Sequence, residues 1–375
     1  MCIRDSSVDT AEKEAMRSVL SQCPSGQTIP VYNGNNASPE VPLPNPDPTP
    51  DDTHGQMIRL FGNNRYDTMT DVVDTAFPEE TSTVIVTSGE NYPDALAVSG
   101  FAGIENAPVL LTNPQVLSAN VRNEIKRLKP SSVVIVGGEK AVSSDVESSL
   151  KQCVDGVERI QGATRIDTAL QIYEAGKSLS AGWGETAVVV TGGNNQNGFA
   201  DALSVTSYAY AQKAPVFLSD AETGLTADQQ NALKDGNFTQ IVIVGGAQAV
   251  PEFFSAQIEQ TVGIKPIRIA GQTRYNTSIL FARWAIGQGA LTMNNVVFTT
   301  GQNYPDALSG GPLAGRDASC MLLVNNSDAT VSNVGSYVSS YAESVSEAYI
   351  LGGANAVSWN TAGRLSKSLG LALTN

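Results

Sequence analysis

The sequence predicts an α/β fold of three tandem Rossmann-like modules, each with a parallel sheet covered by helices on both faces. Three observations predict it. Four short phrases occur in the same order three times along the 375-residue chain. Within each copy, apolar runs of strand length alternate with longer segments of helical spacing. Glycine-bearing loops follow two of the apolar runs, as they do at strand-to-helix turns of a parallel sheet.

The four phrases define a unit of about 105 residues. The first carries two arginines and a threonine: RLFGNNRYDT at 59–68, RIQGATRIDT at 159–168 and RIAGQTRYNT at 268–277. The second is an apolar run and a glycine-bearing loop that lead to Asp-Ala-Leu at 94–96, 201–203 and 306–308. The third is an apolar strand: APVLLT at 107–112, APVFLS at 214–219 and SCMLLV at 319–324. The fourth ends in two glycines: VVIVGG at 133–138, IVIVGG at 241–246 and AYILGG at 348–353.

Composition divides the chain ahead of the repeats. Residues 1–32 hold a helix-like segment with sparse apolar spacing, which we interpret as the remnant of a preceding domain. Residues 33–56 carry prolines at almost every second position and predict a semi-rigid polyproline II spacer. The repeats then occupy 57–158, 159–267 and 268–375, and each is large enough to be a domain with its own core.

The predicted strands are short, and β-branched residues dominate them. Residues 133–136 and 241–244 are continuous apolar runs, typical of strands buried on both faces of a parallel sheet. Helical spacing with a polar outer face covers 118–129 and 226–234. Ser118 and Thr226 open these helices and are predicted N-caps.

The Gly-Gly pair after the fourth run predicts a sharp exit from its strand, and Ser143, Pro251 or Ser358 can begin the next helix. A phosphate-binding loop is the alternative interpretation of the glycines. The turn lacks the full G-x-G-x-x-G spacing, and no Walker lysine motif is present, so we favour a structural turn. Three related domains in one chain could pack with approximate threefold symmetry, and we expect a monomer with this internal pseudo-trimer.

The charge balance excludes several classes of partner. The net charge is −14, from 37 acidic and 23 basic residues, so nucleic acid is not an expected partner. The low positive charge argues against a polybasic membrane site, and no stretch is long enough for a transmembrane helix. Residues 1–20 have no continuous apolar region and do not resemble a signal peptide. Either the protein is cytoplasmic or its natural N-terminus is missing from this chain, and the remnant and spacer favour the second.

The sequence gives little support for a metal site or for histidine-dependent catalysis. His54, the single histidine, lies in the spacer. The four cysteines show no metal-ligand spacing: Cys2, Cys23, Cys153 and Cys320. A zinc site or a histidine-dependent triad would need unusual ligands or bases, so we expect no metal and no cofactor.

Two sets of charged residues survive in all three copies. Asp94, Asp201 and Asp306 stand where a helix should begin and are interpreted as helix caps; a catalytic or metal-binding carboxylate is the alternative. Arg65, Arg165 and Arg274 could bind a carboxylate or phosphate of a ligand in bidentate fashion. They could instead form salt bridges to a neighbouring copy or to an aspartate such as Asp94. Arg59, Arg159 and Arg268 lie on the preceding strand and are expected to be structural.

Three apolar triplets recur in the third phrase: Val109, Leu110 and Leu111; Val216, Phe217 and Leu218; Met321, Leu322 and Leu323. Their simplest interpretation is a core strand, unless a strand end opens into a groove.

Together the phrases R-[LI]-x-G-x-x-R, DAL, A-P-V-L-L-T and V-x-I-V-G-G resemble the cell-wall-binding repeat type 2 family, from residue 57 to about residue 370. This resemblance implies Rossmann-like modules packed as a pseudo-trimer beside a variable effector domain. It also implies non-covalent attachment of a Gram-positive surface protein to an anionic cell-wall polysaccharide, with the apolar triplets and nearby grooves as polymer-binding positions. The copies differ at Ile166, Phe217, Cys320 and Val324, which predicts unequal sites.

We therefore predict a non-catalytic, extracellular anchoring module that binds an anionic wall glycopolymer through its triplets and repeated arginines. The alternatives are the wall-targeting part of an amidase-like peptidoglycan hydrolase whose catalytic domain lies outside this chain, a structural surface-layer component, and a nucleotide-dependent enzyme.

Overall fold

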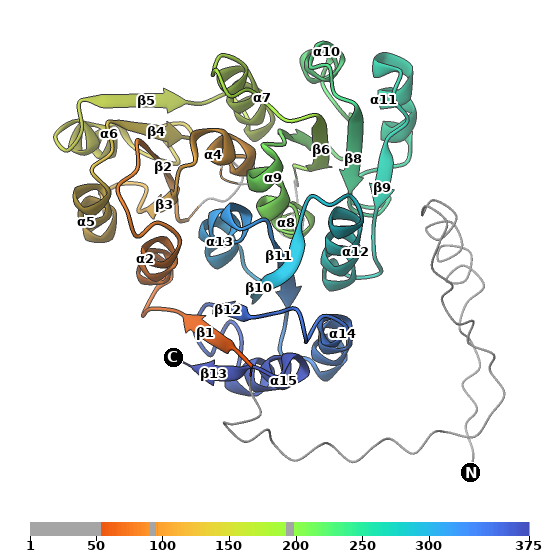
Figure 1. Ribbon diagram of the computed structural model, residues 1–375. Helices are drawn as coiled ribbons and strands as arrows, with labels where there is room; N and C mark the ends of the chain where they lie inside the picture. Colours follow the sequence, from red (N-terminus) through yellow and green to blue (C-terminus); the bar gives the residue numbers. More distant parts are fainter. Residues whose placement is uncertain (1–53, 91–94, 96, 193–198, 375) are drawn as a thin grey trace. The chain divides into compact units, whose positions relative to one another are not determined.

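A computed structural model describes residues 54–90, 95, 97–192 and 199–374. They belong to the second of two units, Asp47–Asn375, while the first unit is Met1–Pro46. The predicted remnant at 1–32 and most of the spacer at 33–56 lie outside the described residues. The described residues form three parallel sheets that alternate with helices, which confirms the predicted α/β class (Figure 1).

Each sheet is built mainly from one repeat. The first has the order β3-β2-β4-β5, with strands β2 (Thr83–Ser88), β3 (Val109–Thr112), β4 (Ser132–Val136) and β5 (Gly156–Ile160). The second has the order β7-β6-β8-β9, with strands β6 (Thr186–Thr191), β7 (Val216–Ser219), β8 (Gln240–Val244) and β9 (Ile267–Ile269). The third has the order β11-β10-β12-β1-β13, with strands β1 (Gln56–Leu60), β10 (Thr292–Thr300), β11 (Ser319–Val324), β12 (Glu347–Leu351) and β13 (Ala372–Thr374).

The strand that opens each sequence repeat joins the sheet of another repeat. β5, which carries Arg159, pairs with β4 of the first repeat, and β9, which carries Arg268, pairs with β8 of the second. β1, which carries Arg59, pairs with β12 of the third repeat on one side and with β13 on the other. The repeats are thus linked in a closed cycle, because the first strand of repeat 1 completes the sheet of repeat 3.

The helices have the following bounds. Repeat 1 contributes α2 (Arg65–Ala76), α4 (Ser99–Glu105), α5 (Ala119–Leu128) and α6 (Ser144–Lys151). Repeat 2 contributes α7 (Arg165–Lys177), α8 (Phe199–Leu203), α9 (Thr206–Gln212), α10 (Ala227–Asp235) and α11 (Phe253–Val262). Repeat 3 contributes α12 (Arg274–Gly287), α13 (Pro305–Arg316), α14 (Asp328–Ser339) and α15 (Trp359–Leu369).

Most of the predicted helix starts are confirmed. The side chains of Ser118 and Thr226 accept hydrogen bonds from backbone N–H groups in the first turns of α5 and α10. Ser143 and Ser358 cap α6 and α15 in the same way. Pro251 does not: α11 begins two residues later and has no side-chain cap. A hydroxyl can satisfy free N–H groups of the first turn, whereas the proline ring offers no acceptor.

The Gly-Gly pair forms a tight turn in every copy. The first glycine has a positive φ: 113° at Gly137, 125° at Gly245 and 98° at Gly352. Residues with a side chain rarely adopt this conformation. The N–H of Gly137 donates to Ile160 O, and those of Gly245 and Gly352 make the equivalent bonds to Ile269 O and Leu60 O, each 2.9 Å long. The turn thereby extends the ladder to the strand that comes from the next repeat.

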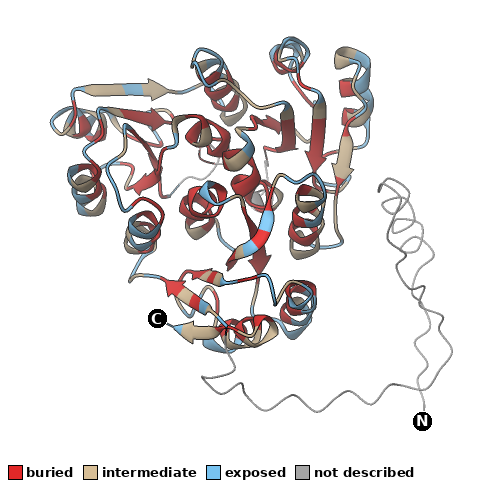
Figure 2. Ribbon diagram, viewed as in Figure 1, coloured by how far each residue is buried: buried red, intermediate tan, exposed pale blue. Residues whose placement is uncertain are grey.

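Corresponding helices of the three repeats contact one another at the centre of the described unit. α4, α9 and α13 pack together, and most of their residues are buried (Figure 2). Glycines allow the close approach. A methyl group at Gly103 would collide with the carbonyl oxygen of Tyr210, and one at Gly315 would collide with the Tyr210 side chain.

These helices merge the hydrophobic cores. One continuous cluster contains buried residues of all three repeats, such as Leu110, Leu218 and Leu322. A second cluster, around Tyr173 and Phe254, belongs to repeat 2 alone. The prediction of a separate core for each copy is therefore wrong: the central helices bury their apolar surface against each other rather than within one repeat.

We predict that Gly103→Ala lowers the free energy of unfolding by about 1–3 kcal/mol, because the added methyl group must displace the backbone of α9. Gly363→Ala is the matched control. Gly363 lies inside α15 with no atom in the path of a Cβ, so alanine there should stabilise the fold by about 0.5–1 kcal/mol. Urea denaturation of both variants measures the difference, and equal effects would contradict the central packing.

Candidate functional site

The candidate site is a cavity of about 290 Å³ at the carboxyl ends of the strands of the third sheet. In this sheet β11 lies on one side of β10 and β12 lies on the other. The chain runs from β10 to β11 and then crosses back to β12, so the strand order reverses between β10 and β12. Open parallel sheets bind ligands at this kind of switch point. Three loops line the cavity: residues 62–65 after β1, residues near Asp306 before α13, and residues 353–356 after β12.

The cavity is formed by two repeats. The loop with Arg65 belongs to repeat 1, whereas Asp306 and the loop after Gly352 belong to repeat 3. We call it the 3/1 junction, and the corresponding positions between the other repeats the 1/2 and 2/3 junctions. Tyr304 also crosses the 3/1 junction, since its hydroxyl donates to Glu90 O at 2.7 Å.

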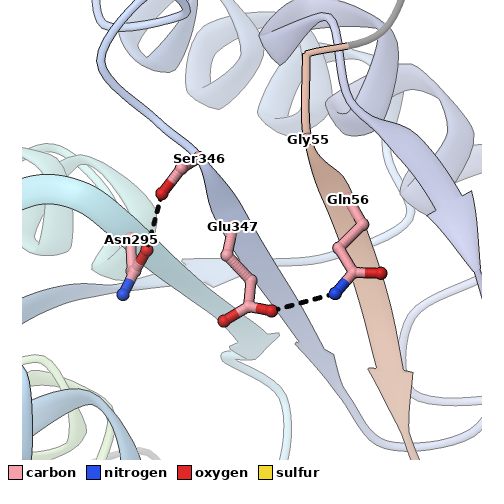
Figure 3. A pocket seen from close by; sticks show the side chains of 5 residues that line it. All are labelled: Gly55, Gln56, Asn295, Ser346 and Glu347. Atoms are coloured by element: carbon pink, nitrogen blue, oxygen red, sulfur yellow. Dashed lines mark hydrogen bonds between the residues drawn. The ribbon is translucent and has the colours of Figure 1, made fainter.

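A wider opening of about 660 Å³ lies at the opposite, amino end of the same sheet (Figure 3). Its side chains bond to each other: Gln56 Nε2 donates to Glu347 Oε1 at 3.1 Å, and Ser346 bonds to Asn295 at 3.4 Å. Few polar groups therefore remain to orient a ligand, and the strand ends there are not the carboxyl ends. We take the 3/1 junction as the better candidate.

The repeated arginines of the first helical turn share one contact. Arg65 donates through Nη1 to Gly89 O, Arg165 to Gly192 O at 2.8 Å, and Arg274 to Gly301 O at 2.6 Å. Each acceptor follows the first central strand of the same repeat. Every arginine thus ties its helix start to the loop at the carboxyl end of that strand.

The same arginines also act on aspartates of the preceding repeat. Burial raises the pKa of Asp306 to about 6, and the positive charge of Arg65 opposes this rise. Burial likewise raises the pKa of Asp201, against a hydrogen bond from Thr277 and the charge of Arg274. Arg65 and Arg274 therefore lower the pKa of an aspartate of the preceding repeat across the 3/1 and 2/3 junctions, and the predicted salt bridge to a neighbouring copy stays a prediction. Asp94 lies outside the described residues.

The capping role predicted for Asp306 is wrong. The N-cap of α13 is Tyr304, whose side chain makes no capping bond, and Asp306 lies inside the first turn. Its carboxylate instead lies against Gly352, where a side chain would meet Asp306 Oδ2. Asp201 lies in the first turn of α8 and against Gly245 in the same way. The aspartates fill the space that the glycines leave open, because a Cβ at either glycine would collide with the carboxylate.

Sequence reasoning missed the threonine that closes the first phrase. The N–H of Gly62 donates to Thr68 Oγ1 at 3.1 Å, and Thr168 and Thr277 accept the same bond from Gly162 and Gly271. These threonines are almost fully buried. Their recurrence in every copy was the available signal, and the bond holds the arginine-bearing loop in place.

The strand arginines are structural, as predicted. Arg59 donates to Gly352 O at 2.7 Å, Arg159 to Gly137 O at 2.7 Å, and Arg268 to Gly245 O at 3.0 Å. Each bond joins the strand that opens one repeat to the Gly-Gly turn of another. These arginines therefore hold the junctions together.

The structure corrects the polymer-binding role predicted for the apolar triplets. All nine side chains are at most 3% exposed: Val109, Leu110, Leu111, Val216, Phe217, Leu218, Met321, Leu322 and Leu323. They lie on β3, β7 and β11 and pack in the shared and local cores. Direct contact with a polymer is incompatible with this burial, so the core interpretation holds for these positions.

Other classes of site find no support in the part of the chain that the structure describes. That part has no cluster of three histidine, cysteine, aspartate or glutamate side chains placed to hold a metal. Cys153 and Cys320 are free thiols. None of its helices is long and apolar enough to cross a membrane.

The sequence profile described as Cell wall binding domain 2 (CWB2) matches residues 59–147, 159–254 and 268–362. The chain belongs to this family. Each CWB2 match lies within one of the three predicted repeats and ends before the strand that comes from the next repeat.

Curated relatives share the CWB2 region. N-acetylmuramoyl-L-alanine amidase LytC of Bacillus subtilis (strain 168) is 29% identical over 269 residues, which cover 71% of this chain and 50% of the relative. The amidase enhancer of the same organism is 32% identical over 269 residues, which cover 71% of this chain and 34% of the relative. The chain thus spans half or less of these relatives.

Solved structures show the same fold. Cwp6 from Clostridium difficile superposes with a TM-score of 0.74 at 22% identity, covering 86% of this chain and 48% of that one. Cwp8 from the same organism gives 0.72 at 25% identity, covering 84% of this chain and 52% of that one.

We predict that Asp306→Asn removes a pH dependence of stability. The pKa of Asp306 is raised in the folded protein, so its ionisation destabilises the fold. This penalty is absent below the ordinary carboxyl pKa, grows as the pH rises to about 6, and is complete above it. Wild-type protein should therefore lose about 1–2 kcal/mol relative to Asp306→Asn between pH 4 and 7.5. Parallel urea titrations across this range measure it, and parallel curves would refute it.

Proposed function

We propose that this CWB2 chain is a non-catalytic anchoring module that binds an anionic cell-wall polysaccharide at the junctions between its repeats. The observation that carries this proposal is the 3/1 cavity, which two repeats form at the switch point of a parallel sheet. The cavity combines an arginine, an N-terminal helix turn and a backbone-lined Gly-Gly loop. Backbone N–H groups and a guanidinium suit the oxygen-rich groups of an acidic polysaccharide.

Three junctions on one chain suit a repetitive ligand. In this proposal the repeats form an intramolecular pseudo-trimer around α4, α9 and α13, so that the junctions are arranged about one centre. Weak contacts at several junctions then add as avidity, on the order of 10² or more over one contact when the polymer can reach them together. The protein acts outside the cell, at the wall, as a monomer.

Positive charge at the junctions must overcome the repulsion between the acidic protein and an anionic polymer. The net charge of −14 repels an anionic polymer, so attraction depends on basic groups at the junctions. The loops after the Gly-Gly turns differ in this respect: Glu139 and Lys140 at the 1/2 junction, uncharged Ala247 and Gln248 at 2/3, and uncharged Ala354 and Asn355 at 3/1. Glu139 offsets Lys140, so these loops add no net charge at any junction, and attraction of the polymer depends on the repeated arginines.

The same binding activity would serve a larger wall enzyme. The match to LytC covers 71% of this chain and half of that amidase, which favours a wall-targeting role for the repeats beside an effector domain. Anchoring and targeting are one activity here, because both require only wall binding.

The test is retention of the purified chain on protein-free Gram-positive cell walls. We expect retention at low and moderate salt that weakens as salt screens the junction charges. Asp306→Asn should be retained more strongly than wild type at pH 7.5, where the aspartate is ionised, and equally at pH 4.5, where it is largely protonated.

A neutral polysaccharide resin serves as the control matrix. Absence of retention at moderate salt would overturn the proposal. Release of soluble wall fragments by the chain alone would instead show a catalytic activity and overturn its non-catalytic part.

A further inference from the structure

The three junctions differ in how the strand arginine is neutralised. At the 1/2 junction Arg159 forms an ion pair of 2.7 Å with Glu147. At the 2/3 junction Arg268 lies 3.6 Å from a carboxylate oxygen of Glu252. At the 3/1 junction, counting from the Gly-Gly turn, Ala362 stands at the position of Glu147 and Trp359 at the position of Glu252.

Arg59 of the 3/1 junction therefore has no carboxylate partner among the described residues. It is 3% exposed, and its Nε and Nη2 atoms are buried without a hydrogen-bond acceptor. Only Nη1 is bonded, to Gly352 O. Burial lowers the pKa of Arg59, although a guanidinium remains charged at neutral pH. The guanidinium of Arg59 is thus held at this junction without an ion-pair partner among the described residues.

Trp359 covers this charge. The guanidinium carbon of Arg59 lies 4.2 Å from the centroid of the Trp359 ring, which is a cation–π contact. Trp359 is 44% exposed, so part of the indole remains open to solvent beside this contact. A cation beneath the ring reduces the negative potential on its opposite face, so that face becomes suited to a ring that carries negative charge.

A second exposed aromatic residue lies beside the cavity. Phe61 is 41% exposed and follows Arg59 by two residues, just beyond the end of β1. Its ring comes within 3.8 Å of the position of a Cβ at Gly353, which lines the cavity. The other copies have Gln161 and Ala270 at this position. Both of these positions thus carry an exposed large aromatic side chain at the 3/1 junction, and neither position does so at the other two junctions.

We propose that the 3/1 junction is the principal sugar-binding subsite of the chain, where Trp359 and Phe61 stack on a negatively charged sugar ring under the influence of Arg59. This inference rests on the proposed function and specifies its ligand contact. The C–H groups on one face of a pyranose ring form an apolar surface that packs on an aromatic face, and uronate or phosphate groups on the ring gain from the unpaired arginine. The 1/2 and 2/3 junctions would then contribute weaker contacts.

Substitutions at exposed Trp359 can distinguish the contribution of the aromatic ring to binding from that of the Arg59 charge. Trp359→Ser introduces the residue of the 1/2 junction and removes the ring. Trp359→Glu introduces the residue of the 2/3 junction, which removes the ring and also gives Arg59 a carboxylate partner. Trp359→Tyr keeps an aromatic ring. Phe253→Ser is the matched control, because Phe253 is 48% exposed but lies on α11, outside the 3/1 junction.

The experiment measures binding of polysaccharide released from protein-free Gram-positive walls and cut to fragments of one or two repeat units, which excludes avidity. Isothermal calorimetry with the full chain gives the affinities. We expect Trp359→Ser to weaken binding about tenfold, Trp359→Glu to weaken it further, and Trp359→Tyr to lose less than the serine variant. Phe61→Gln should weaken binding by a smaller factor, and Phe253→Ser should bind as wild type does.

Thermal unfolding of each variant shows that the fold is retained, and Trp359→Glu should be at least as stable as Trp359→Ser because it pairs Arg59. Wild-type affinity in a folded Trp359→Ser variant, or an equal loss in Phe253→Ser, would overturn the inference while the proposed function stands. No binding of walls or fragments by the wild-type chain would overturn the proposed function and this inference with it.

Discussion

The pairing of each repeat's opening strand with the sheet of another repeat is the constraint on which the rest of the structure depends. β1 pairs with β12, β5 with β4 and β9 with β8, so a sheet built from one repeat alone would lack a strand. The strand arginine and the positive-φ glycine secure each pairing, since one N–H and one carbonyl of the turn are both bonded across it. The cycle closes between repeat 3 and repeat 1, and this closure creates the 3/1 junction.

The central helices depend on the same closure. α4, α9 and α13 come from different repeats and approach closely because glycines replace side chains at their contacts. Their apolar faces are covered only when all three repeats are in place, which explains why one core cluster runs through the unit. Helix propensity opposes glycine in a helix interior. The packing that glycine permits outweighs that cost here.

The junctions share their backbone but differ in the side chains around it. Every junction has a strand arginine bonded to a Gly-Gly turn. Glutamates neutralise this arginine at two junctions, whereas an exposed tryptophan covers it at the third. The parts that close the cycle are thus the same at all three junctions, whereas the outer positions differ. The proposed difference in affinity between the junctions depends on these outer positions.

The sequence by itself determined the presence of three repeats, the α/β class, most helix starts and the structural role of Arg59, Arg159 and Arg268, because periodicity, capping and turn chemistry are local properties. It did not determine which sheet receives the opening strand. Arg59 and Gly352 are 293 residues apart, and no local pattern specifies that pairing. Only the tertiary structure decided that the apolar triplets are buried, that the aspartates fill the space beside the glycines, and that Trp359 meets Arg59. These facts depend on packing between repeats, where burial and neighbouring charges are set by residues distant in sequence.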